Sequence, residues 1–381
     1  MNDPINGQAY LEMMLRQEKE KRPGFSGFSE YLESKARKRG IPIHGQFELT
    51  PFCNFNCKMC YVHLLPEQMN GRSVLTAGQW KELILEAWKS GMFQATLTGG
   101  ECLTYPWFDE IYLYLHSLGC EVNVMTNGLL LDDNRISFFK KHPPASVQIT
   151  LYGSNNDAYE KVTGRRAFSM VAENIRRVEE ADLPVVLSMT PCSYLGEDAL
   201  ETLRFAYGTE HEVLINSMLF TPHQETGRTG TGAEADIDLY VRLYRLQAEL
   251  KGKKLDDHYE GSLPEPGGPF HECAECGLQC GGGRSGFIMN WKGEMIPCNR
   301  LDMIMEYPLR DGFATAWTNL NRRAENWPRI PECDGCAYET VCRNCAANTL
   351  QFGEPGKKPE KLCERTMYFV RHGVWEIPEC E

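Results

Sequence analysis

Apolar residues in the middle of the chain follow two alternating patterns. Short runs with β-branched or alternating apolar residues predict strands, and the longer runs between them have apolar residues at helical spacing. The predicted strands are Gln46–Leu49, Gln94–Thr98, Val122–Thr126, Val147–Leu151, Val185–Thr190 and Glu212–Phe220. The predicted helices are Thr76–Ser90, Trp107–Leu118, Asp132–Lys141, Phe168–Glu180 and Glu197–Tyr207.

This alternation makes six strand–helix units and indicates an α/β fold with a parallel sheet covered by helices. Six such units fit either an open barrel or a doubly wound sheet, and periodicity alone does not separate the two. The polar and charged N-terminus, Met1 to Arg22, predicts a helix rather than a signal peptide.

The composition changes after the sixth strand. A Gly- and Thr-rich linker precedes a predicted helix at Asp236–Lys251, and the sequence from Cys273 onward is rich in cysteine and turn residues. We therefore expect four parts: an N-terminal helical extension (1–43), the strand–helix domain (44–235), a helix and linker (236–270) and a cysteine-rich domain (271–381).

Overall charge and hydropathy narrow the classes of partner. The formal net charge is −12, whereas nucleic-acid binding needs a basic face. No stretch approaches the roughly 20 apolar residues that a membrane helix requires. We expect neither a nucleic-acid nor a membrane partner.

The chain has sixteen cysteines. Disulfide-dense scaffolds are small and secreted, whereas this chain is large and shows no secretion signal. We therefore expect a cytoplasmic protein whose cysteines bind metal.

The tightest cysteine group follows the first predicted strand. Three residues separate Cys53 from Cys57, and two separate Cys57 from Cys60. Three thiolates can hold three irons of a four-iron cluster and leave one iron open, as a catalytic zinc site keeps one position open. A zinc site, or a cluster completed by a distant ligand, is the alternative.

A second motif, Gly99-Gly100-Glu101, ends the second predicted strand. Adjacent glycines allow close approach to the backbone, and a glutamate can accept a hydrogen bond from an ammonium group. An ordinary strand-to-helix turn is the alternative. The position of the motif, one unit after the cysteine loop, favours a ligand site.

Together these motifs resemble the radical S-adenosylmethionine (radical SAM) superfamily over roughly residues 44–220. The resemblance implies a partial (β/α)6 barrel and a 4Fe–4S cluster on Cys53, Cys57 and Cys60. It also implies that the open iron binds S-adenosylmethionine (SAM), with Gly99, Gly100 and Glu101 as cofactor contacts. One-electron cleavage would give methionine and a 5′-deoxyadenosyl radical that abstracts a hydrogen atom from a substrate.

Further cofactor contacts follow from the same resemblance. They are Met59, Tyr61, Asn127, Thr150 and Gly153. Met59 departs from the family, which often has an aromatic residue there. For Asn127, Thr150 and Gly153, local turn chemistry is the alternative.

The C-terminal cysteines form a dense ligand set. Paired cysteines two residues apart also indicate structural zinc, so two zinc sites are the alternative. Given the N-terminal motifs, the pattern resembles a SPASM domain, which carries two auxiliary 4Fe–4S clusters. Only the two-residue gap between Cys342 and Cys345 departs from it.

The SPASM resemblance implies a residue-by-residue ligand assignment and three 4Fe–4S clusters in all. The first auxiliary cluster would be held by Cys280, Cys298, Cys345 and Cys276, with Cys273 as the alternative fourth ligand. The second would be held by Cys333, Cys336, Cys342 and Cys363.

Some chemically active residues remain outside these sets. Cys102 and Cys192 are candidate catalytic hydrogen-atom donors, with a small buried apolar role as the alternative. Cys120 is expected to pack in the core. His223, Glu225 and Arg228 are expected either to contact substrate or to form a solvated linker.

Enzymes that resemble this chain mostly modify peptides. We expect a maturase that installs a thioether or carbon–carbon crosslink in a ribosomally made peptide, or epimerises it. The alternatives are a radical dehydrogenase or epimerase of a small molecule such as an aminoglycoside or sugar alcohol, and a non-catalytic iron–sulfur or zinc protein. The expected partners are a low-potential flavodoxin or ferredoxin and a separate leader-peptide-binding protein.

Overall fold

The computed structural model describes residues 27–219, 222–223, 226, 233–252, 277–278, 280–339, 341–342 and 345–377. The helix expected at Met1–Arg22 lies outside these residues, as do Cys273, Cys276 and Cys380. In the described part of the chain, no helix has the length and apolar character needed to cross a membrane.

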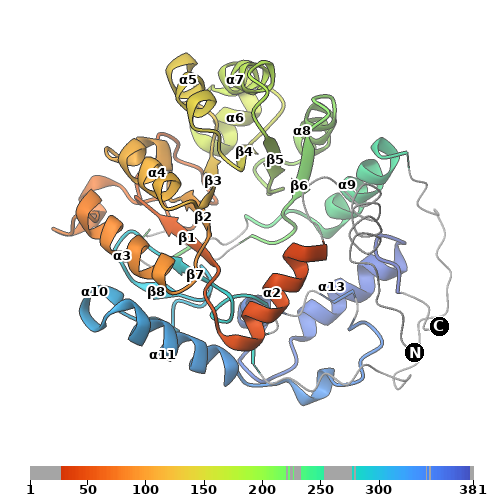
Figure 1. Ribbon diagram of the computed structural model, residues 1–381. Coiled ribbons are helices and arrows are strands. Elements are labelled where there is room, and N and C mark those ends of the chain that lie inside the picture. The colour runs from red at the N-terminus through yellow and green to blue at the C-terminus, as the bar shows by residue number, and fades with distance from the viewer. Residues whose placement is uncertain are drawn as a thin grey trace, which may run out of the picture.

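A curved sheet organises the molecule, with helices along its outer side (Figure 1). Its first six strands are β1 His44–Glu48, β2 Gln94–Thr98, β3 Glu121–Thr126, β4 Ser146–Leu151, β5 Val185–Met189 and β6 Glu212–Ile215. They lie in sequential order and every neighbouring pair is parallel. A doubly wound sheet would reverse its strand order, so the structure decides for the open barrel.

The helices of the strand–helix units lie close to their predicted positions. They are α3 Ala77–Lys89, α4 Phe108–Ser117, α5 Asp133–Lys141, α6 Asn156–Thr163, α7 Phe168–Glu180 and α8 Asp198–Tyr207. Helix α6 was not predicted. Strand β6 is shorter than expected because its partner β5 ends before Pro191, which has no backbone N–H to continue a ladder.

Local sequence fixes both helix starts and strand faces. Thr76 begins α3 with a capping box, in which its hydroxyl accepts from the Gln79 backbone N–H while the Gln79 side chain accepts from the Thr76 N–H. In β4, Val147, Ile149 and Leu151 are buried, while the intervening residues are partly exposed. One face of each strand therefore packs against helices, and the other faces the barrel interior.

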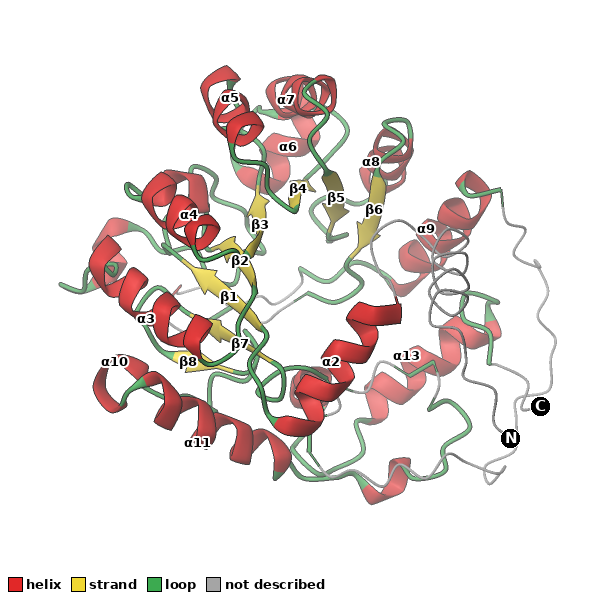
Figure 2. Cartoon of the chain, viewed as in Figure 1, coloured by secondary structure: helices red, strands yellow, loops and turns green. Residues whose placement is uncertain are grey.

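The cysteine-rich region joins the same sheet. Its elements are β7 Gly286–Met289, β8 Met295–Ile296, α10 Pro308–Asp311, α11 Phe313–Glu325, α12 Ala346–Phe352 and α13 Glu360–Arg371. Strand β7 pairs in parallel with β1, and β8 pairs antiparallel with β7. Figure 2 shows the sheet continuing from β1 into these two strands.

Aromatic packing connects the two regions into one core. Phe47 of β1 contacts Trp80 of α3 and Phe287 of β7, each with ring centroids 5.9 Å apart. Phe287 in turn contacts Phe313 and Trp317 of α11. Two further helices, α2 Gly27–Arg39 and α9 Ile237–Leu250, complete the α-helices of the described residues, which also form short 3-10 helices at Pro66–Met69, Cys102–Thr104 and Pro331–Cys333.

Candidate active site

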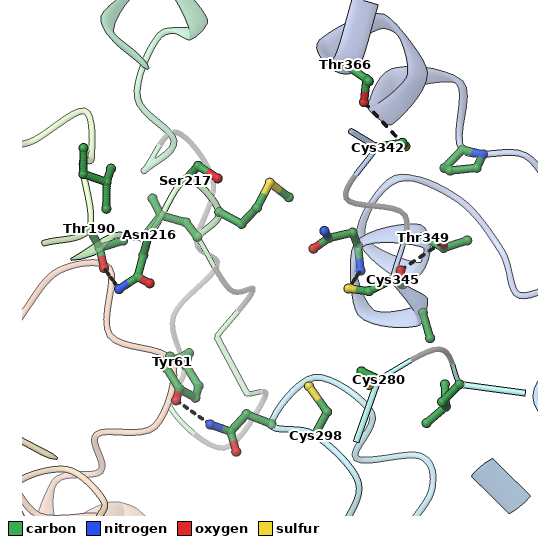
Figure 3. A pocket seen from close by; sticks show the side chains of 18 of the residues that line it. Tyr61, Thr190, Asn216, Ser217, Cys280, Cys298, Cys342, Cys345, Thr349 and Thr366 are labelled. Atoms are coloured by element: carbon green, nitrogen blue, oxygen red, sulfur yellow. Dashed lines mark hydrogen bonds between the residues drawn. The ribbon is translucent and has the colours of Figure 1, made fainter. Parts of the chain in front are cut away.

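A cavity of about 1640 Å³ lies where the strand ends of the barrel meet the cysteine-rich loops. In Figure 3, Thr190, Asn216 and Ser217 lie on its barrel side, and Cys342 and Cys345 lie on the opposite side. Tyr61 lies below the first group, and Cys298 lies at the bottom of the view between the two sides. Ligands in parallel α/β folds bind at the carboxyl ends of strands, so this cavity is the candidate site.

The three-cysteine loop forms one wall of the cavity, and Cys53, Cys57 and Cys60 all line it. Helix α6 anchors this loop from outside, because the backbone N–H groups of Asn56 and Lys58 donate to the last turn of α6 at 2.9 and 3.0 Å. The element that the sequence analysis missed therefore holds the cysteines in place.

The surroundings of these sulfurs suit thiolate ligands. The Phe55 N–H donates to Cys53 Sγ and the His63 N–H donates to Cys60 Sγ, both at 3.3 Å. Burial raises the pKa of the Cys53 thiol to about 12, whereas a coordinated cation deprotonates a thiol. Three soft thiolates with N–H donors around one cavity fit an iron–sulfur cluster.

Gly99 and Gly100 also line the cavity. The cysteine loop packs so closely against both residues that neither position has space for a side chain. A Cβ on Gly99 would lie 2.4 Å from the Thr50 carbonyl oxygen, and one on Gly100 would lie 2.3 Å from the Phe52 carbonyl oxygen. Gly99 also has φ of +139°. The two glycines let the end of β2 lie directly against the start of the cysteine loop.

Glu101 is turned away from the cavity surface. It is 1 % exposed, and its carboxylate accepts hydrogen bonds from the backbone of Leu103 and Asn127 and from the Thr126 hydroxyl. Burial raises the pKa of this carboxyl group, although these bonds oppose the shift. Its contact with an ammonium group stays a prediction, while the structure shows it connecting the ends of β2 and β3.

The other predicted cofactor contacts divide into two groups. Met59, Tyr61, Asn127 and Thr150 line the cavity. The Asn127 side chain donates to the Asn54 side chain at 2.6 Å and lies 3.6 Å from Cys53 Sγ. Gly153 is outside the lining, and a Cβ there would lie 2.6 Å from Ala158 of α6, so helix packing explains this glycine.

The two candidate hydrogen-atom donors do not reach the cavity. Cys102 and Cys192 are fully buried and are absent from its lining. Burial raises the pKa of both thiols. Cys102 Sγ lies 3.3 Å from the Met125 carbonyl oxygen. Their surroundings fit the alternative of small buried apolar residues, as does the 6 % exposure of Cys120.

Seven cysteines of the C-terminal region line the same cavity as the barrel cysteines. They are Cys280, Cys298, Cys333, Cys336, Cys342, Cys345 and Cys363. Among the described residues, no three His, Cys, Asp or Glu side chains converge like the ligands of a single metal ion. The choice between Cys273 and Cys276 lies outside the described residues.

The predicted loop after β6 is described only in part. His223 lies 3.3 Å from Asp302 and is outside the cavity lining, and Glu225 and Arg228 lie outside the described residues. The sequence analysis also missed polar residues of the cavity, namely Gln46, Gln148, Ser188, Thr190, Asn216 and Asn299. For Gln148 and Ser188, the available signal was their inward position in strand alternation.

Comparison with known proteins places this site in context. Residues 47–206 match the radical SAM superfamily. The chain is 31% identical over 154 residues to the sporulation killing factor maturation protein SkfB of Bacillus subtilis, covering 39% of this chain and 36% of that protein. It is 25% identical over 335 residues to the PqqA peptide cyclase of Rhodopseudomonas palustris, covering 83% and 86%.

The fold itself has a solved counterpart. The crystal structure of Streptococcus suis SuiB bound to S-adenosylmethionine is similar with a TM-score of 0.65 at 16% identity, over 94% of this chain and 88% of that chain. This likeness concerns the fold, and it agrees with the partial (β/α)6 barrel that the radical SAM resemblance implied. The chain thus spans about a third of SkfB but most of the other two proteins.

Proposed function

We propose, from the premise that residues 47–206 form a radical SAM domain, that this chain is an enzyme that modifies a ribosomally made peptide by hydrogen-atom abstraction. The modification would be a thioether or carbon–carbon crosslink, or an epimerisation. The observation that carries the proposal is the shared cavity, which Cys53, Cys57, Cys60 and the seven C-terminal cysteines all line.

The size of the cavity supports a substrate beyond the cofactor. Pockets for small ligands measure about 300–1,000 Å³, and this cavity measures about 1640 Å³. The predicted clusters, the cofactor and a segment of peptide would share this volume.

Each part of the lining has a distinct task in this proposal. Cys53, Cys57 and Cys60 would hold a 4Fe–4S cluster, which with bound SAM supplies one-electron cleavage to methionine and a 5′-deoxyadenosyl radical. The backbone at Gly99 and Gly100 offers the close contact surface for the methionine part. The Asn127 side chain, which is hydrogen-bonded to Asn54 of the cysteine loop, would position the cofactor between the end of β3 and that loop.

The auxiliary clusters occupy the opposite wall in this proposal. Their ligands would be the seven cysteines of the C-terminal lining together with Cys276 or Cys273. With three clusters, the chain would hold about twelve irons. Hydrogen bonds from the Asn348 backbone to Cys345 Sγ and from the Thr366 hydroxyl to Cys342 Sγ support thiolates at these positions.

The names of similar proteins favour a peptide over a small molecule. SkfB is a maturation protein, the second relative is a peptide cyclase, and SuiB has also been solved bound to its precursor peptide SuiA. A low-potential flavodoxin or ferredoxin would supply the electron, and a separate protein would present the leader peptide. The reduced thiols of the cytoplasm suit this chemistry.

A co-expression experiment tests the substrate class. The chain is expressed anaerobically with each short, cysteine-containing peptide encoded beside its gene, and the peptides are analysed by mass spectrometry. A crosslink appears as loss of two hydrogen atoms, and epimerisation in deuterated water appears as deuterium uptake at an α-carbon. The variant Cys53→Ala must abolish the change, while Cys120→Ala, a cysteine outside the lining, must preserve it. Conversion of an aminoglycoside or sugar alcohol, with every peptide unchanged, would contradict the peptide proposal.

A further inference from the structure

The residues that follow Cys298 connect three parts of the cavity wall. The Asn299 side-chain amide donates to the Tyr61 hydroxyl at 2.7 Å, a contact drawn in Figure 3. The next residue, Arg300, points to helix α12, where its guanidinium donates to the side-chain oxygens of Asn348 at 3.2 Å and of Gln351. Helix α12 begins directly after Cys345.

Arg300 therefore lies between two cysteines that the SPASM resemblance assigns to the same auxiliary cluster. Its backbone N–H donates to Cys298 Sγ, and its positive charge acts on the sulfurs of both Cys298 and Cys345. The Asn348 backbone, one turn into α12, donates to Cys345 Sγ at 3.4 Å. One side chain thus fixes the Cys298 loop to the Cys345 helix.

The described hydrogen-bond partners of the Arg300 guanidinium are neutral, which leaves its positive charge in place. Asn348 and Gln351 are neutral amides, so these two hydrogen bonds hold the side chain without cancelling its charge. Among the described residues, the charge of Glu234 acts on Arg300, and Glu234 accepts a hydrogen bond from Gln351 at 2.6 Å. The side chain is partly buried, where charge interactions are stronger than in water.

A fixed positive charge beside a thiolate-ligated cluster has a definite effect. Reduction adds one electron and makes the cluster more negative, so a nearby cation stabilises the reduced form more than the oxidised form. Reduction potentials of such clusters depend on net charge, hydrogen bonds and exposure. A cation at this place therefore raises the potential and makes the cluster easier to reduce.

We propose that the Arg300 guanidinium, held in place by Asn348 and Gln351, is a fixed positive charge that raises the reduction potential of the first auxiliary cluster. This inference rests on the proposed function, because that function supplies the cluster. The charge of one side chain would then set the difference in reduction potential between the first auxiliary cluster and the second, whose proposed ligands are Cys333, Cys336, Cys342 and Cys363.

Redox titration of the full chain tests the proposal. Wild type, Arg300→Gln, Arg300→Lys and Arg310→Gln are reconstituted anaerobically and reduced stepwise while electron paramagnetic resonance records each cluster signal. Arg310 is a matched control, because it is exposed and pairs with Asp311 on the surface. Arg300→Gln should move one midpoint to more negative potential and leave the others in place. Arg300→Lys, which keeps the charge, and Arg310→Gln should keep the wild-type midpoints.

Wild-type midpoints in Arg300→Gln would overturn the inference. Equal shifts in Arg300→Gln and Arg300→Lys would also overturn it, because they would show a structural clamp rather than a charge effect. If Arg300→Gln loses iron, Gln351→Glu decides, since it places a carboxylate beside the intact guanidinium and should lower the same midpoint. A wild-type chain with about four irons instead of about twelve would remove the auxiliary clusters from the proposed function itself.

Discussion

The carboxylate of Glu101 offers a test of how the second motif works. The structure shows this carboxylate buried and accepting hydrogen bonds from three N–H or O–H donors, Leu103, Thr126 and Asn127, with the Cys102 thiol as a longer contact at 3.9 Å. The variant Glu101→Gln keeps the shape of the side chain but replaces one acceptor oxygen with an NH₂ group. Because all three partners donate, the new NH₂ group must face at least one N–H or O–H.

The cost follows from the number of bonds affected. One Glu101 oxygen accepts from Leu103 and Thr126, and the other accepts from Asn127. In either orientation of the new side-chain amide, its NH₂ group therefore replaces an acceptor and at least one hydrogen bond to a charged oxygen is lost. Such a bond contributes about 1.5–3 kcal/mol. We expect Glu101→Gln to lower the free energy of unfolding by at most about 1.5–3 kcal/mol in the cofactor-free chain, because the neutral amide also avoids the cost of burying a charge.

Urea unfolding of the cofactor-free chain, followed by tryptophan fluorescence, measures this change. Glu121→Gln is the control, because Glu121 is exposed and, within the described part of the chain, its carboxylate accepts from a neutral amide, Gln94. That variant should stay within about 0.5 kcal/mol of wild type. If Glu101→Gln unfolds like wild type but binds SAM more weakly, the carboxylate contacts the ligand and the structural reasoning is wrong.

Three other perturbations test separate parts of the account. Cys53→Ala should lower the iron content by about four per chain and abolish SAM cleavage, whereas Cys120→Ala should change neither; equal iron in both variants would contradict the ligand assignment. Gly99→Ala should destabilise the chain because its Cβ would lie 2.4 Å from a carbonyl oxygen. Gly78→Ala in α3, whose Cβ would lie 3.9 Å from the Thr76 hydroxyl, should stabilise the chain by about 0.4–1 kcal/mol, as denaturation midpoints would show. Burial raises the pKa of Glu48 from 4.5 to about 7, so folding stability should fall by about 3 kcal/mol as pH rises from below 4.5 to above 7. Glu48→Gln should remove that fall, and parallel stability–pH curves for the two proteins would refute it.

Regular elements were predictable where the pattern was strong. Strand β2 and helix α7 begin and end at the predicted residues, because alternation and helical spacing are clear there. Helix α6 was missed because it is short and polar, although Asn155 as N-cap and Gly164 as C-cap marked both its ends. Strand β7 was missed because four residues in a turn-rich region give no period.

In the candidate site, too, the features with a local sequence pattern were predictable and the long-range contacts were not. The cysteine and glycine motifs could be found because their spacing is local, and the structure brings their residues to one cavity. The hydrogen bond between Tyr61 and Asn299 joins residues 238 positions apart, and no local pattern encodes it. The pairing of β7 with β1 and the aromatic packing around Phe287 bring such distant loops together.

The glycines of the second motif illustrate how structure changes an explanation. From sequence, Gly99 and Gly100 indicated close approach of a ligand. The structure adds close approach of the chain itself, because the carbonyl groups of Thr50 and Phe52 occupy the space of both side chains. The motif therefore shapes the cysteine loop as well as the cavity surface.

Reductive cleavage of S-adenosylmethionine tests the central claim most directly. The full chain is reconstituted anaerobically with iron and sulfide, reduced with dithionite and incubated with SAM, and the products are separated by liquid chromatography with mass detection. The account predicts 5′-deoxyadenosine and methionine, formed by wild type and by Cys120→Ala but not by Cys53→Ala. A chain that binds zinc, lacks an iron–sulfur chromophore and leaves SAM intact would contradict it.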